Sequence, residues 1–405
     1  MAVPVAEVEM PEIGLDADAS EAQRRAALTD LAARTWIART PLGYVITRHA
    51  DVTAMLRDRR WFSAIGLIAQ MQGVDDPEWN RRSGQNILGM EGDEHQRLRR
   101  LVGPAFTPKA AERLRPFMAE VINELADPLC ARGHGDFVVE VCEPYPIPIV
   151  CELLGAPRDD WELFSRLATD IFRVFNGNLA RDLQTIMAAQ DEMGAYMSQL
   201  IAERRAEPRD DLLSDLIAAE EAGDRLTTEE MQSLANAVLL AGTDTTRNQL
   251  ACAVELFARS PDQLRLLRDQ PSLAPQAAEE VMRHFGAIRG TARYASENIA
   301  YRGVEFPSST LIFPSFTAAN HDESQFDQPL RFDITRRSRA PHMTFGSGIH
   351  YCLGAFLARA ELQEALKVVA QRMPDLRLDG EVEWKPVSNG IWGPSTLPIR
   401  FTPGH

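Results

Sequence analysis

The stretch Phe345–Arg359 reads FGSGIHYCLGAFLAR and holds a cysteine set among glycines, directly before a helical pattern. Gly346, Gly348 and Gly354 let the backbone adopt conformations closed to other residues and pass close to a bulky flat object. Unpaired N–H groups at the start of a helix stabilise an anion, so we expect a lowered pKa for the Cys352 thiol and a role as an iron ligand. The alternative is that Cys352, like most free cysteines, is a small buried apolar side chain.

The wider motif decides between these alternatives. Phe345, Gly346, Gly348, His350, Cys352 and Gly354 spell F-G-x-G-x-H-x-C-x-G, which specifies six positions in ten and resembles the heme-binding loop of the cytochrome P-450 family. The resemblance implies that Cys352 is the axial ligand of the iron of heme b, and that Phe345 packs beside the sulfur. Gly354 then belongs to the cofactor-binding residues.

Length and composition indicate an ordinary globular chain. It has 405 residues, of which 45% are hydrophobic and 25% charged. Without a visible linker, we expect one domain over residues 21–405 after a loosely ordered N-terminal tail at 1–20. The net charge of −15 argues against nucleic acid or anionic membranes as general partners.

The cysteine count and the N-terminus bear on the compartment. Five cysteines without a C-x-x-C pair predict neither disulfides nor a zinc site. The first twenty residues lack a basic start and an apolar core, and no stretch reaches the roughly 20 apolar residues of a membrane span. We expect a cytoplasmic monomer without a membrane anchor.

Hydrophobic periodicity predicts a mainly α fold with small β-sheets. Helices are expected near 21–35, 93–102, 108–132, 147–154, 160–175, 179–205, 228–260, 274–285 and 355–372, with short strands near 43–49, 298–306 and 310–316. Residues 60–90 read as a long irregular loop. The helix at 228–260 is the longest, and Thr227 with Glu230 forms a capping-box pattern at its start.

The middle of this long helix carries polar groups in an apolar run. Gly242, Asp244, Thr245 and Thr246 lie within AGTDTT, where we expect the helix to open locally and admit water. The alternative is that a buried threonine bonds the carbonyl of the preceding turn and does nothing more. The tract is similar to the oxygen-activating segment of the family, which implies that Thr245 and Asp244 deliver protons while dioxygen is activated.

The pair Glu280 and Arg283, in EEVMR, is by itself typical of a marginal surface salt bridge. Its position resembles the family's Glu-x-x-Arg pair, which implies a structural role. The following meander is matched by Asn320, Asp322, Phe326, Pro329, Phe332 and Asp333, with His321 where many members have arginine. Gly286-Ala287 stands where relatives commonly have proline.

Two heme propionates need cationic partners. His95 and Arg99 share a helix face, Arg293 follows Arg283 by ten residues, and His350 precedes Cys352 by two. All four match the family's propionate contacts. The alternative for each is a solvated surface charge.

The resemblance also implies an apolar substrate pocket above the heme. The candidates are Ile87, Leu88, Phe172, Phe175, Leu234, Val238, Ala241, Ile288, Ile391 and Trp392. Such a lining suits a terpenoid, fatty-acid-like, steroid or aromatic molecule, whereas the alternative is that these residues are simply core. A second expected surface is a basic face for an acidic ferredoxin, made of Arg97, Arg100, Arg336, Arg337, Arg339 and Lys367.

Taken together, the motifs predict a cytochrome P-450 fold with heme between the long central helix and the helix after the cysteine loop. The implied activity is hydroxylation or epoxidation of a hydrophobic small molecule with dioxygen, using electrons from NAD(P)H through a ferredoxin reductase and ferredoxin. The alternatives are a peroxide-driven heme-thiolate peroxygenase and a non-catalytic heme sensor or carrier. Asp244 and Thr245 speak against the peroxide route, which needs no proton relay from dioxygen.

Overall fold

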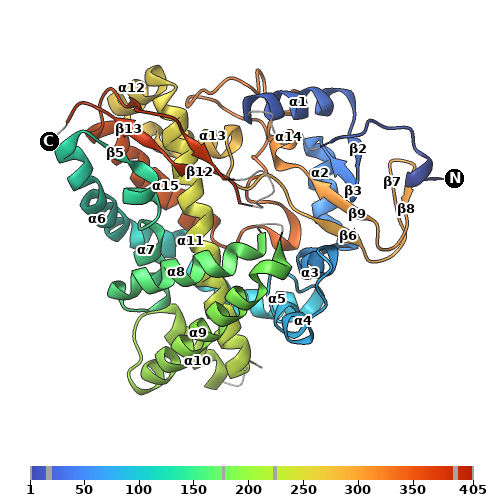
Figure 1. The fold of residues 1–405 in the computed structure, drawn as a ribbon, viewed down its shortest axis with the longest axis horizontal. Coiled ribbons are helices and arrows are strands. Elements are labelled where there is room, and N and C mark those ends of the chain that lie inside the picture. Colours follow the sequence, from blue (N-terminus) through green and yellow to red (C-terminus); the bar gives the residue numbers. More distant parts are fainter. Residues whose placement is uncertain (1, 15–20, 176–177, 222–225, 386–390, 404–405) are drawn as a thin grey trace.

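A computed structural model describes residues 2–14, 21–175, 178–221, 226–385 and 391–403. The chain is mainly helical with small sheets, as the sequence predicts (Figure 1). The helices are α1 Glu21–Arg34, α2 His49–Arg57, α3 Ile68–Met71, α4 Pro77–Gly84, α5 Gly92–Val102, α6 Pro108–Arg132, α7 Pro146–Leu154, α8 Trp161–Ile171, α9 Leu179–Ala206, α10 Leu212–Glu221, α11 Thr228–Ala258, α12 Pro261–Asp269, α13 Ala274–His284, α14 Phe316–Asn320 and α15 Ala355–Arg372.

Within these described ranges, the strands form four small sheets. Their bounds are β1 Val3–Pro4, β2 Ile37–Thr40, β3 Gly43–Ile46, β4 Trp61–Ser63, β5 His134–Asp136, β6 Arg293–Ala295, β7 Ile299–Tyr301, β8 Val304–Phe306, β9 Leu311–Pro314, β10 Arg377–Leu378, β11 Glu383–Trp384, β12 Pro394–Thr396 and β13 Pro398–Arg400. The largest sheet has the order β2-β3-β9-β6-β4, and its antiparallel β4–β6 pair sets Ser63 opposite Arg293. Figure 1 shows this sheet beside α1 and α2, across the molecule from α6.

The N-terminal segment is attached to these sheets, which differs from the loose tail that we expected. β1 pairs in parallel with β8, so that Val3 lies opposite Val304. The backbone of Arg39 exchanges hydrogen bonds of 2.8 Å with Pro11 and Ile13. Val5 is buried in the core beside the large sheet. Residues 1 and 15–20 of the expected tail lie outside the described residues.

The segment 60–90 is more ordered than the sequence suggested. It contributes β4 to the large sheet and forms α3 and α4. Asp76 caps α4 by accepting the Trp79 backbone N–H at 2.9 Å, and Pro77 occupies the first turn. This Asp-Pro start is a helix signal that the irregular composition concealed.

The long central helix α11 has 31 residues and runs through the molecule (Figure 1). Its predicted capping box is confirmed, because the Thr227 side chain accepts the Glu230 N–H while the Glu230 side chain accepts the Thr227 N–H. The half that follows Gly242 is almost entirely buried against neighbouring helices, including α7 and α15. α11 therefore forms a rigid wall on which a site can be built.

The loop before α15 needs glycine for a local reason. Gly346 and Gly348 have φ of 70° and 74°, in the left-handed region. A Cβ on Gly348 would lie 2.0 Å from the Leu56 carbonyl oxygen at the end of α2. This glycine therefore lets the loop pack on α2, whereas we expected it to make room for a flat cofactor.

Candidate active site

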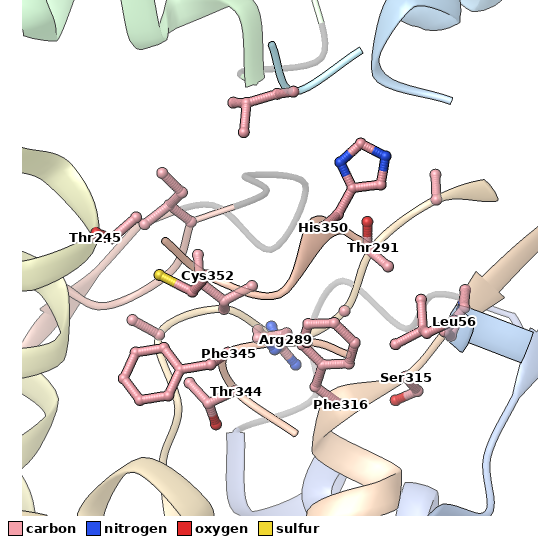
Figure 2. Close-up of a pocket in the computed structure, with 18 of the residues that line it drawn as sticks. Leu56, Thr245, Arg289, Thr291, Ser315, Phe316, Thr344, Phe345, His350 and Cys352 are labelled. Atoms are coloured by element: carbon pink, nitrogen blue, oxygen red, sulfur yellow. The ribbon is translucent and has the colours of Figure 1, made fainter. Parts of the chain in front are cut away.

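A cavity of about 1740 Å³ brings two of the sequence motifs together. α11 lines it with Ala241 and Thr245, and the loop before α15 lines it with Phe345, Cys352 and Gly354. Figure 2 shows Cys352 and His350 on this loop, with Thr245 on the helix that faces it. The cavity therefore lies where the sequence predicted heme, between the central helix and the cysteine loop.

Cys352 is held by the backbone of its own loop. Its N–H donates to the Phe345 carbonyl oxygen at 2.9 Å, and α15 begins three residues later at Ala355. Burial raises the pKa of the Cys352 thiol, while a hydrogen bond from the Gly354 backbone and the charge of Arg99 act in the opposite direction. We expected the start of the helix to lower the pKa of the Cys352 thiol, and this expectation is wrong for the protein without a bound metal. The Cys352 thiol would become a thiolate on binding a metal ion, which favours the deprotonated sulfur.

The four predicted propionate contacts meet at one side of the cavity. His95, Arg99, Arg293 and His350 all line it, although they come from α5, β6 and the cysteine loop. Burial lowers the pKa of Arg99 and of Arg293. Arg293 donates to the Thr291 hydroxyl at 2.8 Å, which fixes its guanidinium in the cavity wall.

The two histidines lie side by side, with ring centroids 4.5 Å apart. His350 Nε2 lies 3.0 Å from a carboxylate oxygen of Glu91, which also accepts the Ser63 N–H at 2.6 Å. Burial, together with the charges of His350 and Arg99, lowers the pKa of His95 to about 4. His95 Nδ1 is buried and finds no hydrogen-bond partner among the described residues. Glu91 belongs to this cluster with His95 and His350, although it was not predicted from the sequence.

These residues fit a heme. The cavity offers one thiol, several cationic groups for two carboxylates, and an orphaned ring nitrogen on His95. A Cβ on Gly354, which also lines the cavity, would meet no atom of the described chain within 4 Å. Within the described residues, no cluster of three or more His, Cys, Asp or Glu side chains could hold a metal ion by itself.

The polar tract of α11 is divided between two surroundings. The Thr245 hydroxyl lies in the cavity wall and donates to the Ala241 carbonyl oxygen at 2.8 Å. The described cavity lining includes Thr245 and Thr246 but not Asp244. The Asp244 carboxylate instead lies 3.4 Å from Lys385 Nζ and 3.7 Å from Arg247 Nε. α11 is a continuous α-helix here, so the local opening that we expected is wrong.

Thr246 has a partner that the sequence did not suggest. Its hydroxyl donates to Glu361 Oε2 of α15 at 3.2 Å, and Glu361 also lines the cavity. Burial raises the pKa of Glu361 to about 8, against the effect of the Thr246 hydrogen bond. The acid is therefore largely protonated at neutral pH.

Glu280 and Arg283 form a buried ion pair on α13, and not the marginal surface salt bridge that their spacing alone suggests. Arg283 donates from Nε and Nη2 to the carboxylate at 2.7 and 2.9 Å. Arg283 Nη1 also reaches the carbonyl oxygens of Asn320 and Pro329, both at 2.9 Å, so the pair ties α13 to the meander. Arg336 donates to Glu280 at 3.0 Å.

Most of the predicted substrate residues line the cavity. They are Ile87, Leu88, Phe172, Leu234, Val238, Ala241, Ile288 and Ile391. Trp392 is a correction: it is 2% exposed, is not among the described lining residues, and stacks on Trp384 with centroids 4.5 Å apart. The Phe175 side chain lies outside what the structure describes.

The absence of proline at Gly286-Ala287, where relatives commonly have one, has a structural reason. The Ala287 N–H donates to Gln249 Oε1 of α11 at 3.0 Å, which a proline could not do. A Cβ on Gly286 would lie 2.7 Å from the Thr344 hydroxyl oxygen. This stretch is therefore tied to α11 just before Ile288 enters the cavity.

The basic face is smaller than we expected. Arg336 is bound to Glu280, Arg97 to Glu94 and Glu230, and Lys367 to Glu364. Arg100, Arg337 and Arg339 are exposed. Glu94 and Glu364 lie three residues before Arg97 and Lys367, so helical spacing could have revealed these two pairs. Glu230 and Glu280 are distant in sequence from Arg97 and Arg336, so spacing could not reveal those.

The chain matches a known protein family. The family model described as cytochrome P450 matches residues 159–374, more than half of the chain. The chain belongs to the cytochrome P450 family. Luteothin monooxygenase from Streptomyces thioluteus is 36% identical over 372 residues, covering 91% of this chain and 90% of that protein. Mycinamicin IV hydroxylase/epoxidase from Micromonospora griseorubida is 38% identical over 373 residues, covering 89% and 91%.

Solved structures support the same assignment. The crystal structure of CalO2 superposes with a TM-score of 0.88 at 32% identity, covering 95% of this chain and 97% of that chain. The predicted P450 fold is therefore confirmed, and the protein is a P450 monooxygenase that acts on a small molecule with dioxygen at a heme iron. No helix in the described ranges is long and apolar enough to cross a membrane.

Proposed function

We propose that this P450 binds heme b through Cys352 and hydroxylates or epoxidises a large or elongated hydrophobic molecule. The observation that carries the proposal is a cavity of about 1740 Å³, which joins the Cys352 thiol, the four predicted propionate contacts and the apolar lining. When bound, heme supplies the site at which dioxygen is reduced and one oxygen atom passes to the substrate.

Residues of the chain itself bind the heme propionates and deliver protons. Arg99, Arg293 and the two histidines bind the propionates. Thr245 holds a hydroxyl in the cavity wall, where it can pass a proton after it releases the Ala241 carbonyl. Asp244 supplies that proton only after it leaves Lys385 and Arg247, because its carboxylate lies on another face of α11.

The extent of the cavity supports the substrate class. Its lining continues past Ile288 to Leu28 and Leu31 of α1 and to Pro41 and Leu42 at the β2–β3 turn. Apolar side chains dominate along this path, which suits a long or bulky apolar ligand. The names of the relatives, luteothin monooxygenase and mycinamicin IV hydroxylase/epoxidase, agree with hydroxylation or epoxidation of a secondary metabolite.

We propose that electrons come from NAD(P)H through a reductase and a ferredoxin that docks near Cys352. Support comes from Tyr351 and Phe356, which are 38% and 44% exposed on either side of the cysteine. Arg100 is exposed on α5 and adds positive charge. Raising the salt concentration should slow reduction by ferredoxin but leave reduction by dithionite unchanged.

The substitution Thr245→Ala tests the oxygenase proposal. It removes the hydroxyl from the cavity wall, so NADH consumption should continue while the released product becomes mostly hydrogen peroxide. Thr243→Ala is a matched control, because the Thr243 hydroxyl is buried and donates to the Leu240 carbonyl oxygen at 2.9 Å. Equal coupling in both variants and in the wild type would contradict the role of Thr245.

The substrate class has its own experiment. Hydrophobic compounds of increasing length are titrated into the heme-loaded protein, and the spin-state change of the heme spectrum is measured. Leu42→Trp should weaken binding of the long compounds only, because Leu42 is an exposed lining residue at the β2–β3 turn. A preference for compact compounds that is unaffected by Leu42→Trp would overturn the assignment.

A further inference from the structure

Arg359 of α15 lies over the aromatic ring beside the cysteine ligand. Its guanidinium carbon is 4.5 Å from the centroid of the Phe345 ring. The Phe345 carbonyl oxygen in turn accepts the Cys352 N–H at 2.9 Å, and both residues line the cavity. A full positive charge is thus stacked on the ring whose backbone holds the sulfur-bearing residue.

Glu279 of α13 fixes this arginine from the other side. Arg359 Nε and Nη2 donate to the two carboxylate oxygens at 2.5 and 3.1 Å. A bidentate pair holds the plane of the guanidinium as well as its position. The Tyr351 hydroxyl lies 3.4 Å from Arg359 Nη1 and adds a weaker contact from the cysteine loop.

The two charges do not act equally on Cys352. The Arg359 side chain is 23% exposed, whereas Glu279 is 43% exposed and so is screened more strongly by water. Arg359 lies over the Phe345 ring, whereas the Glu279 carboxylate contacts Arg359 and lies 3.4 Å from His342 Nε2. Arg359 therefore contacts the cysteine loop directly, and Glu279 is joined to that loop through Arg359.

We propose that Arg359 and Glu279 are a pair of positioning residues that sets how strongly Cys352 donates electrons to the heme iron. The inference rests on the proposed heme-thiolate function. Reduction of ferric heme adds one negative charge, which a nearby cation stabilises and a nearby anion opposes. The two residues should therefore move the ferric/ferrous equilibrium in opposite directions.

The experiment is a dye-coupled redox titration of the heme-loaded, substrate-free protein. Arg359→Met should lower the equilibrium constant for reduction about threefold, which equals about 30 mV for a one-electron couple. Glu279→Gln should raise it. Arg359→Lys keeps the charge but loses the bidentate fork, so its value should fall between those of Arg359→Met and the wild type.

Matched controls remove the same charges elsewhere. Arg377→Met on β10 and Glu383→Gln on β11 change exposed residues and should leave the midpoint potential at the wild-type value. Shifts of Arg359→Met and Glu279→Gln in the same direction, or no larger than the controls, would overturn the inference. If Arg359→Met does not retain heme, Glu279→Gln and Arg359→Lys decide the question.

The failure of this inference is distinguishable from failure of the proposed function. Reduced wild-type protein under carbon monoxide reports thiolate ligation through a strongly red-shifted Soret band. If that band is present and the potentials do not move, only the role of Arg359 and Glu279 is wrong. If the band is absent from the wild type, the assignment of Cys352 as ligand is wrong, and the inference falls with it.

Discussion

Two acid-containing pairs, on two helices, behave differently in this molecule. On α13, Glu280 and Arg283 are three residues apart and meet in the interior at 2.7 Å. On α11, Asp244 and Thr245 are adjacent, which turns them about 100° apart around the helix. Thr245 lines the cavity and Asp244 bonds with Lys385 outside the lining. The comparison shows that spacing decides whether two side chains act as one unit.

The largest expected effect tests the unit on α13. Arg283→Met removes one partner of a buried ion pair, and we expect a loss of about 3–5 kcal/mol in the free energy of unfolding. Urea denaturation followed by circular dichroism measures it. Arg331→Met is the control, because Arg331 is 63% exposed and lies 3.6 Å from Asp333; its loss should stay below about 1 kcal/mol. Equal losses would contradict the structural importance of the pair.

The second prediction separates the adjacent residues on α11. Asp244→Asn should lower substrate oxidation about 100-fold, as expected for removal of a general acid, without the peroxide release of Thr245→Ala. Lys385→Met, which removes one of the two cations beside the Asp244 carboxylate, should not slow turnover. Product formation and the solvent deuterium isotope effect are measured for each. If Asp244→Asn keeps the wild-type rate, Asp244 has only an ion-pair role.

The third prediction concerns the spacing on α5. His95 and Arg99 are one turn apart and both reach the cavity, whereas the neighbouring Arg100 is exposed. Loss of a charge-assisted hydrogen bond costs about 1.5–3 kcal/mol, so Arg99→Met should speed heme release at least about tenfold. Heme transfer to apomyoglobin measures the rate. Arg100→Met should release heme as slowly as the wild type, and equal acceleration in both would contradict the assignment.

The smallest effect is a pH dependence of the heme-free protein. The pKa of His95 is about 4 in the folded chain, below the ordinary value of 6.5, so the neutral form is favoured by folding. This contribution to stability is present above pH 6.5 and is lost progressively as the pH falls towards 4. Urea midpoints at pH 7 and pH 5 should differ less in His95→Gln than in the wild type. A parallel decline would show that His95 does not titrate in this range.

The sequence predicted those features that depend on short spacing. The cysteine loop, the capping box of Thr227 and Glu230, and the cations around the cavity all lie within a few residues of the pattern that revealed them. Their side chains are oriented by local helix and loop geometry, so their place in the fold followed once the elements were assigned.

Contacts between segments that are distant in sequence could not be predicted. Glu91 beside His350, Lys385 beside Asp244, and Glu361 beside Thr246 join residues more than 100 positions apart. The expected place of Trp392 in the cavity lining failed for a different reason, because its ring stacks on nearby Trp384 of β11, a contact that the hydrophobic pattern does not distinguish from pocket lining. Buried polar groups need hydrogen-bond partners, but the identity of those partners depends on the tertiary structure.

The central claim is that Cys352 is the thiolate ligand of a heme held in this cavity. The most direct measurement is the spectrum of the reduced protein under carbon monoxide, for the wild type and for Cys352→His. We predict a strongly red-shifted Soret band in the wild type and its loss in Cys352→His. A Soret band at the ordinary position in the wild type, or an unchanged red-shifted band in Cys352→His, would contradict the account.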